Sequence, residues 1–459
     1  MTAPLLHAFG ARYDLPAPLV LYLFAGAGVV VLSFVLIAAL AGEAVGDRAV
    51  RYPRWRARWL DPLAASPLPR ALGGAVGLAA LVAIVAIGLL GPQRATSNAA
   101  EFLLWIYFWA GLVLLTGVVG NLWTLLNPWA ALYAVTAGRS GWKPPLKLPA
   151  WLGIWPAVAG YFLFVCLELA SGLAPDPRVI GALSLAYAAV MYIGMLLYGE
   201  DWLRRCDGFT VLFGIVAMFG PVEIDSESRV WLRPWGVGLL GPWPAGWDRV
   251  VFVILMLASL AFDGLLATPV YAFYNSLLPA QVPAALNKTL ALLVLASVFL
   301  GAFLLTMRFV MWLGWPQLVS PLTPYRGVPV AQAVSAFALT LVPIALVYNA
   351  AHNYTYLVVQ SQALLPLLAD PFGRGWNLLP TAGYKPSFAL AGAAVVWYAQ
   401  VVLIVLGHVI AVYLAHLRAG QRFRDSARAL ISQYPMLLLM VCYTATSLWI
   451  LAQPITREA

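Results

Sequence analysis

The chain has 459 residues, of which 63% are hydrophobic and 10% are charged, and its mean hydropathy is +0.86. This composition excludes a water-soluble globular protein, in which about 25% of residues are charged, and predicts an all-α, polytopic bundle of transmembrane helices in a lipid bilayer. The formal net charge of +9 does not indicate nucleic-acid binding here, because basic loops of membrane proteins face anionic lipid.

Ten apolar segments have close to the ~20 residues that a bilayer requires. We expect a single integral membrane domain over residues 1–459, with short interfacial or re-entrant helices between some spans. The spans are predicted near 18–41, 71–91, 100–120, 151–173, 178–198, 250–272, 290–314, 332–352, 390–415 and 436–453.

The basic residues predict the orientation of the chain. With the N-terminus outside, most of the 27 lysines and arginines fall in cytoplasmic connections, so both termini are predicted to lie outside. The most basic loop is 43–70, and its alternation of Arg and Trp is typical of a helix lying on lipid headgroups. The N-terminus lacks the pattern of a cleaved signal peptide. The three cysteines are far apart in sequence and predict neither a disulfide framework nor a zinc motif.

Two short apolar segments, 121–138 and 209–224, follow the third and fifth spans. The sequence leaves open whether they are re-entrant, interfacial or spanning. The first opens with Gly120-Asn-Leu-Trp, and the second is preceded by Gly199-Glu-Asp-Trp. This recurrence suggests a parallel internal repeat of the kind found in some transporters.

A polar stripe interrupts the apolar sequence after the eighth span. On a continuous helix, Asn349, His352, Tyr356 and Gln360 are three or four residues apart and share one face. Unpaired polar groups in hydrocarbon cost several kcal/mol each, on the order of 2–7. The stripe therefore either bonds to neighbouring helices or lines a site.

Ionisable residues within spans are candidates for function, because a charge at mid-membrane costs at least about 2.5–3.5 kcal/mol. Glu168, Asp263 and His352 are all predicted in the outer half, with Asn349 and Asn353 beside them. Carboxylate and imidazole ligands suit a divalent Zn, Mn or Fe ion, which can activate water for hydrolysis. The same residues can instead relay protons in a transporter, or each can bond separately to a neighbouring helix.

Two further features add candidate residues. The outer loop 367–389 contains Asp370-Pro-Phe-Gly-Arg-Gly-Trp, whose Gly and Pro residues predict defined turns that could cap a cavity. His408 is predicted deep in the ninth span, where it either bonds to another helix or has a functional role, with a quinone or a haem among the alternatives. The candidate substrate-binding residues are Asn349, Asn353, Tyr356, Gln360 and Asp370.

Several stretches resemble a family of bacterial multi-spanning membrane proteins commonly labelled fenitrothion hydrolase. The resemblance covers nearly the whole chain. It implies hydrolysis of an organophosphorus triester, with an aryl group leaving from a thiophosphate, in the bacterial inner membrane. The matching stretches begin at His7-Ala-Phe-Gly-Ala-Arg-Tyr, Gly120-Asn-Leu-Trp, Ala351-His352-Asn-Tyr-Thr-Tyr, Asp370-Pro-Phe-Gly-Arg-Gly-Trp and Gly407-His408-Val-Ile-Ala-Val-Tyr.

Three functions remain open at this point. The first is a metal-assisted hydrolase in which water activated near Glu168, Asp263 and His352 attacks phosphorus. The second is a transporter that uses the same cavity for a small solute or a metal ion. The third is a cofactor-carrying or assembly subunit with a membrane-protein partner.

Overall fold

The computed structural model describes residues 15, 17–40, 53–279, 281–314, 330–389, 391–423 and 426–453. The ends of the chain lie outside the described residues, and so does the first part of the basic loop 43–70. The predicted outer position of both termini therefore stays a prediction.

The prediction of an all-α polytopic bundle is confirmed. Within the described residues, nine helices are long and apolar enough to cross a membrane, and a bent pair of helices makes a tenth span if it is counted as one. The nine are α1 (Leu19–Leu40), α3 (Leu68–Leu90), α4–η3–α5 (Ala99–Glu101, Phe102–Leu112, Val113–Val119), η5–α8–η6 (Ala150–Leu152, Trp155–Val165, Cys166–Ala170), α9 (Pro177–Tyr198), α14 (Ala284–Gly314), α15–η9–α16 (Val330–Ala338, Leu339–Leu341, Val342–His352), α19 (Ala393–Arg422) and α20–α21 (Ser426–Ile431, Tyr434–Ala452).

The bent pair is α12 (Trp247–Leu265) and α13 (Pro269–Ser276), which meet at 89°. The sequence predicts one straight span near 250–272 instead. The bend follows from Thr268, whose hydroxyl accepts from the N–H of Tyr271, and from Pro269, which begins the second helix. Threonine at the N-cap and proline at the first position both favour a new helix start.

Contacts along the chain group into two compact units. Unit 1 comprises Met1–Tyr52, Gly236–Thr355 and Leu390–Ala459, and unit 2 comprises Pro53–Trp235 and Tyr356–Ala389. The prediction of one integral membrane domain over residues 1–459 stays a prediction, and each unit is described by itself below.

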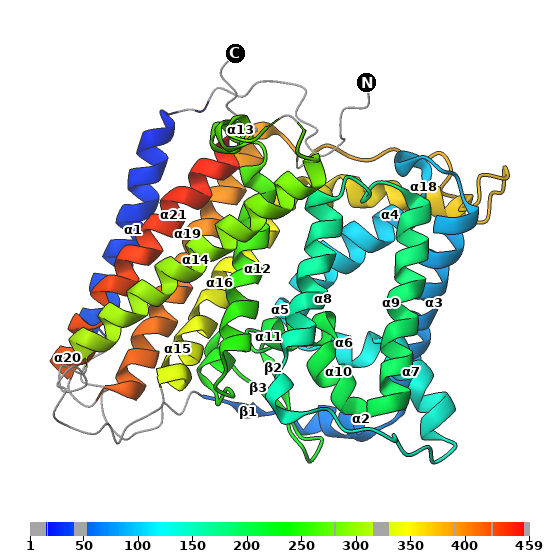
Figure 1. The fold of residues 1–459 in the computed structure, drawn as a ribbon, viewed down its shortest axis with the longest axis horizontal. Coiled ribbons are helices and arrows are strands. Elements are labelled where there is room, and N and C mark those ends of the chain that lie inside the picture. Colours follow the sequence, from blue (N-terminus) through cyan, green and yellow to red (C-terminus); the bar gives the residue numbers. More distant parts are fainter. Residues whose placement is uncertain are drawn as a thin grey trace. The chain divides into compact units, whose positions relative to one another are not determined.

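In unit 1, α19 packs against α16, α1 and α21, while α12 packs against α14, α15 and α16 (Figure 1). Of the candidate spans, α15–η9–α16 is the most buried, whereas α1 exposes most of its apolar side chains. Apolar side chains all around α1 are typical of a helix that faces lipid. A short helix, η7 (Val237–Leu240), precedes α12 and packs against α19.

In unit 2, α3 packs against α9 and against two short helices, α6 and α7 (Figure 1). The apolar helix α11 packs against α5 and α8 and is buried along almost its whole length. The short elements of unit 2 are η1 (Arg58–Leu60), α2 (Asp61–Ala65), η2 (Ala95–Ser97), α6 (Trp123–Leu126), α7 (Pro128–Tyr133), η4 (Ala134–Gly138), α10 (Glu200–Cys206), α11 (Gly208–Ala217), η10 (Gln360–Ala363) and α18 (Leu364–Ala369), and α17 (Tyr354–Val358) begins in unit 1 and ends in unit 2.

A small antiparallel sheet forms where the sequence predicts an interfacial helix. Its strand order is β1 (Trp55–Arg56), β3 (Val230–Leu232), β2 (Val222–Ile224). Trp55 pairs with Leu232, and the guanidinium of Arg54 lies 4.4 Å from the ring centre of Trp231. At Trp55 and Arg56 the chain is therefore a strand and not part of the predicted helix, whereas helical turns follow in η1 and α2.

The two short apolar segments occupy matching places in unit 2. In each case a span ends at a glycine with positive φ, Gly120 at 144° or Gly199 at 71°, and a short helix follows. Asn127 or Asp207 then caps the next helix with its side chain. This shared order of elements agrees with the predicted repeat. Neither α7 nor α11 alone reaches the ~20 residues needed to cross a bilayer.

The two short helix pairs of unit 2 meet at the buried carboxylate of Asp207. One oxygen accepts from the Tyr187 hydroxyl at 2.7 Å and from the N–H of Phe209 at 3.0 Å. The other accepts from the Thr210 hydroxyl at 2.6 Å and from Nε1 of Trp129 at 3.1 Å. Because buried polar groups are costly when unpaired, this set of donors joins α7, α9 and α11.

Replacement of Asp207 by alanine is therefore expected to destabilise the protein. The variant loses an N-cap and leaves buried donors without an acceptor, which together cost about 2–4 kcal/mol. Detergent-solubilised protein titrated with denaturing detergent measures the change. Asp201→Ala is the control, since this nearby carboxylate is exposed and pairs with Arg204 in the same helix. Equal stability of the two variants would contradict a central role for Asp207.

Candidate functional site

Asp263 and His352 form a direct pair in unit 1. Nε2 of His352 lies 2.7 Å from Oδ2 of Asp263, although 89 positions separate them in sequence. The imidazole is 10% exposed and the carboxylate 28%. Asp263 stands near the end of α12 and His352 is the last residue of α16. The sequence predicted this grouping only from the depth of each residue, and the packing of α12 against α16 supplies the contact.

Both helices that carry the pair are interrupted. α12 ends at Leu265, two residues after Asp263, and α13 begins at Pro269 after a bend, while a 3-10 turn divides α15 from α16. Pro343 lies in the first turn of α16, where a backbone N–H would have no hydrogen-bond partner within the helix, so that its absence costs little. Interrupted helices beside ionisable side chains are a recurring feature of membrane transporters, because they free backbone groups at membrane depth.

Tyr348 packs against the histidine of the pair. Its ring stacks on that of His352 with a centroid distance of 5.9 Å and an interplanar angle of 13°. The buried hydroxyl of Tyr348 has no hydrogen-bond partner among the described residues. Gly264 makes room for it, because a Cβ atom there would lie 2.9 Å from that hydroxyl and even closer to Ile450.

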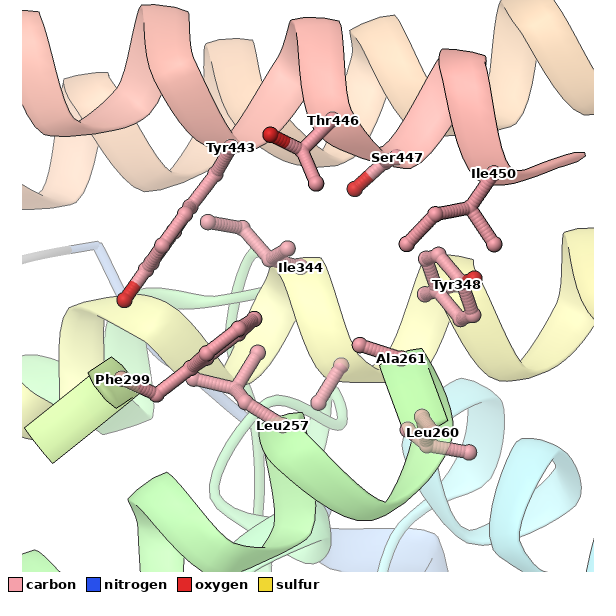
Figure 2. Close-up of a pocket in the computed structure, with 11 residues that line it drawn as sticks. Leu257, Leu260, Ala261, Phe299, Ile344, Tyr348, Tyr443, Thr446, Ser447 and Ile450 are labelled. Atoms are coloured by element: carbon pink, nitrogen blue, oxygen red, sulfur yellow. The ribbon is translucent and has the colours of Figure 1, made fainter. Parts of the chain in front are cut away.

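A small cavity adjoins Tyr348 within unit 1. Figure 2 shows side chains from α21 reaching toward those of α12, α14 and α16 around it. It leaves about 20 Å³ for the centre of a water molecule, which is room for roughly one water. The lining is mainly apolar but includes the hydroxyl-bearing residues Tyr348, Tyr443, Thr446 and Ser447.

Chemically, the pair can hold or transfer a proton. A carboxylate beside an imidazole favours the charged imidazolium, and it fixes the ring when the imidazole is neutral. Either state suits proton exchange with a solute or with water. The cavity next to it is too small for a drug-sized ligand, which needs ~300 Å³ or more.

The predicted polar stripe does not lie on one helix. α16 ends at His352, Asn353 leaves the helical conformation, and α17 begins at Tyr354. Asn353 instead donates its side-chain amide to Oδ1 of Asn349 at 2.9 Å. The expectation of a shared face is wrong here, because asparagine readily makes such local bonds and ends helices. Asn349 is in unit 1, whereas Tyr356 and Gln360 belong to unit 2.

Glu168 lies in η6 of unit 2, while Asp263 and His352 lie in unit 1. Across the part of the chain that the structure describes, no group of three or more His, Cys, Asp or Glu side chains is arranged to hold a metal ion. The divalent ion suggested for Glu168, Asp263 and His352 therefore stays a prediction without an assembled ligand set.

Asp370 organises its own loop in unit 2. Its carboxylate accepts from the backbone N–H groups of Arg374 at 2.9 Å and Gly375 at 2.7 Å. Desolvation raises the pKa of Asp370, but these N–H groups outweigh it and hold the pKa below its usual value. Gly373 and Gly375 have φ of 66° and 76°, which glycine adopts without strain. This geometry gives the predicted binding residue a structural role.

His408 is fully buried in α19, where its Nδ1 donates to the carbonyl of Ile404 at 2.8 Å. Sequence reasoning missed Tyr348, Tyr443 and Ser447. Tyr348 could have been found, since it precedes His352 by four residues and so shares its helix face. Tyr443 and Ser447 gave no such signal, because their contact with the cavity depends on how α21 packs.

Comparison of the chain with models of protein families, with curated protein sequences and with solved structures gives no match.

The Asp370 loop provides a test of this structural role. Asp370→Asn keeps the shape but mimics the protonated carboxyl, so we expect faster cleavage by trypsin after the exposed Arg374 at pH 8. The sign follows from the pKa of Asp370, which folding lowers from 3.8. The stabilisation is fully present above the unfolded value and is lost as pH falls through the lowered one. Asn377→Ala is the control, and equal cleavage of both variants would contradict this role.

Proposed function

We propose that this protein is a proton-coupled membrane transporter for a small solute, in which Asp263 and His352 carry the proton. The observation that carries the proposal is the contact of 2.7 Å between these two ionisable groups in a membrane bundle. Ionisable residues inside spans are costly, and pumps and transporters retain them as proton relays. A carboxylate and an imidazole in contact can share one proton and release it to another acceptor.

The helix breaks around the pair support a conformational change during transport. Asp263 stands one residue before Gly264 and within a turn of the bend between α12 and α13. His352 stands at the end of α16, immediately before the break at Asn353. A change of charge on the pair would therefore act on the ends of two interrupted helices, which absorb changes in backbone angle most readily.

Flux measurements in proteoliposomes test the proposal. A pH-sensitive dye trapped inside reports proton movement while a panel of anionic, cationic and neutral small solutes is added outside. We expect at least one solute to drive proton movement with the wild-type protein, and Asp263→Asn and His352→Gln to reduce it to the rate of empty liposomes. Asp248→Asn is the matched control, since Asp248 lies on the same helix and pairs with Arg249. Absence of proton movement for every solute would reject the proposal.

A second candidate function is hydrolysis of organophosphorus triesters, which the resemblance to fenitrothion hydrolases implies. One observation favours it: an imidazole held by a carboxylate is an arrangement that serves as a general base. In this mechanism His352 takes a proton from water while Asp263 orients the ring. The hydroxide attacks phosphorus, the P–O bond to the aryl substituent breaks, and the aryloxide leaves and takes up the proton from His352.

Turnover of a nitrophenyl thiophosphate triester by purified protein tests this second function. His352→Ala is expected to lower kcat by about 10²–10⁴-fold, the usual contribution of a general base. His416→Gln is the control, because this histidine bonds to Gln433 and lies away from the pair in sequence. Unchanged turnover in His352→Ala would remove the pair from any hydrolytic mechanism.

A further inference from the structure

One face of α19 carries three polar side chains that are buried in the bundle. Trp397 and His408 are 0% exposed and Gln400 is 6% exposed. At 100° per residue the three fall within roughly 80° of arc, over a rise of about 16 Å. Ile404, between them, packs with Tyr348 and Ala351 of α16 and with two leucines of α21. This polar face of α19, defined by Trp397, Gln400 and His408, therefore points into unit 1.

Each of these side chains has a polar atom without a hydrogen-bond partner among the described residues. The atoms are Nε1 of Trp397, Oε1 of Gln400 and Nε2 of His408. Native proteins satisfy nearly all buried polar atoms, so three exceptions on one helix face call for a common explanation. Inside a membrane protein such atoms occur beside ordered water or another polar ligand.

The chemistry of the three atoms identifies the ligand. A carbonyl oxygen only accepts, so the bond to Ile404 places the proton on Nδ1 of His408 and leaves a lone pair on Nε2. Oε1 of Gln400 is likewise an acceptor, while Nε1 of Trp397 is a donor. Water both donates and accepts, and so it satisfies all three.

The polar face begins beside the Asp263–His352 pair. Nε2 of Gln400 donates to the carbonyl of Ala351 at 3.1 Å, and Ala351 immediately precedes His352. Further along, α16 and α19 approach closely, since a Cβ atom at Gly407 would collide with Val347. His408 shares the buried side of α19 with Ile404, which packs against Tyr348 and Ala351 of α16, next to the pair in sequence.

We propose that the polar face of α19 holds a file of bound water molecules that extends from the Asp263–His352 pair to His408. The waters bridge Trp397, Gln400 and the open lone pair of His408. Their use as a route by which protons reach the pair rests on the proposed transport function, whereas the water sites themselves do not.

Radiolytic labelling of the full-length protein in lipid nanodiscs tests for the water sites. X-ray pulses generate hydroxyl radicals from bound water, and mass spectrometry then locates the oxidised side chains. Normalised to intrinsic reactivity, Trp397 and His408 are expected to be oxidised several-fold faster than Phe303 and Met307. These controls are also 0% exposed, lie in the same unit and have no polar atoms that would hold water.

Two variants sharpen the result. Trp397→Phe removes only the indole N–H and its pyrrole ring, and Gln400→Leu removes the amide, so each is expected to lower the labelling of His408. Val402→Leu is the control, because Val402 is 63% exposed on another face of the same helix. Unchanged labelling of His408 in a well-folded Trp397→Phe variant would count against a shared file of water.

Labelling of Trp397 and His408 at the background rate of Phe303 and Met307 would overturn the water sites. That outcome leaves the role of the Asp263–His352 pair intact, since the flux measurements test the pair through its own variants. Conversely, labelled sites in a protein that moves no protons would reject the transport function alone.

Discussion

The hydrogen bond between Asp263 and His352 is the interaction on which the proposed function depends. Each side chain is costly in an apolar bundle when it is unpaired, and the contact between the two lowers that cost. Their contact requires that α12 and α16 lie side by side and that both helices end near the same level. The pair therefore reports on the packing of unit 1 as well as on its chemistry.

Interruptions of the helices lie beside several of the buried polar groups. α12 bends after Asp263, α16 stops after His352, and in unit 2 the short helices break at Asn127 and Asp207. Capping side chains and prolines begin the helices that follow these breaks at α13, α7 and α11, whereas α16 ends where Asn353 leaves the helical conformation. Helix breaks of this kind therefore occur in both units, but they surround different groups. In unit 2 the group is a fully bonded buried carboxylate, and in unit 1 it is an ionisable pair beside a cavity.

The contrast between Asp207 and Asp263 separates a structural carboxylate from the one to which we assign a function. Asp207 accepts four hydrogen bonds and is fully buried. Asp263 is partly exposed and faces an imidazole, a group that can bind and release a proton. Proton transport and general-base hydrolysis both need this second kind of group. They differ in what occupies the neighbouring space, so measurements of flux and of turnover distinguish them.

The sequence by itself determined the membrane class and the approximate limits of the spans, because some twenty consecutive apolar residues have few other stable structures. It also singled out Asp263 and His352, since ionisable residues stand out in apolar helices. Single residues marked two of the helix breaks: Thr268 and Pro269 favour a new helix start, and Asn353 favours a helix end. The prediction missed both breaks because it relied on the hydropathy of the surrounding spans. Only the tertiary structure decided that Asp263 contacts His352 and that Tyr348 stacks on it, because contacts across 89 positions depend on which helix faces pack together.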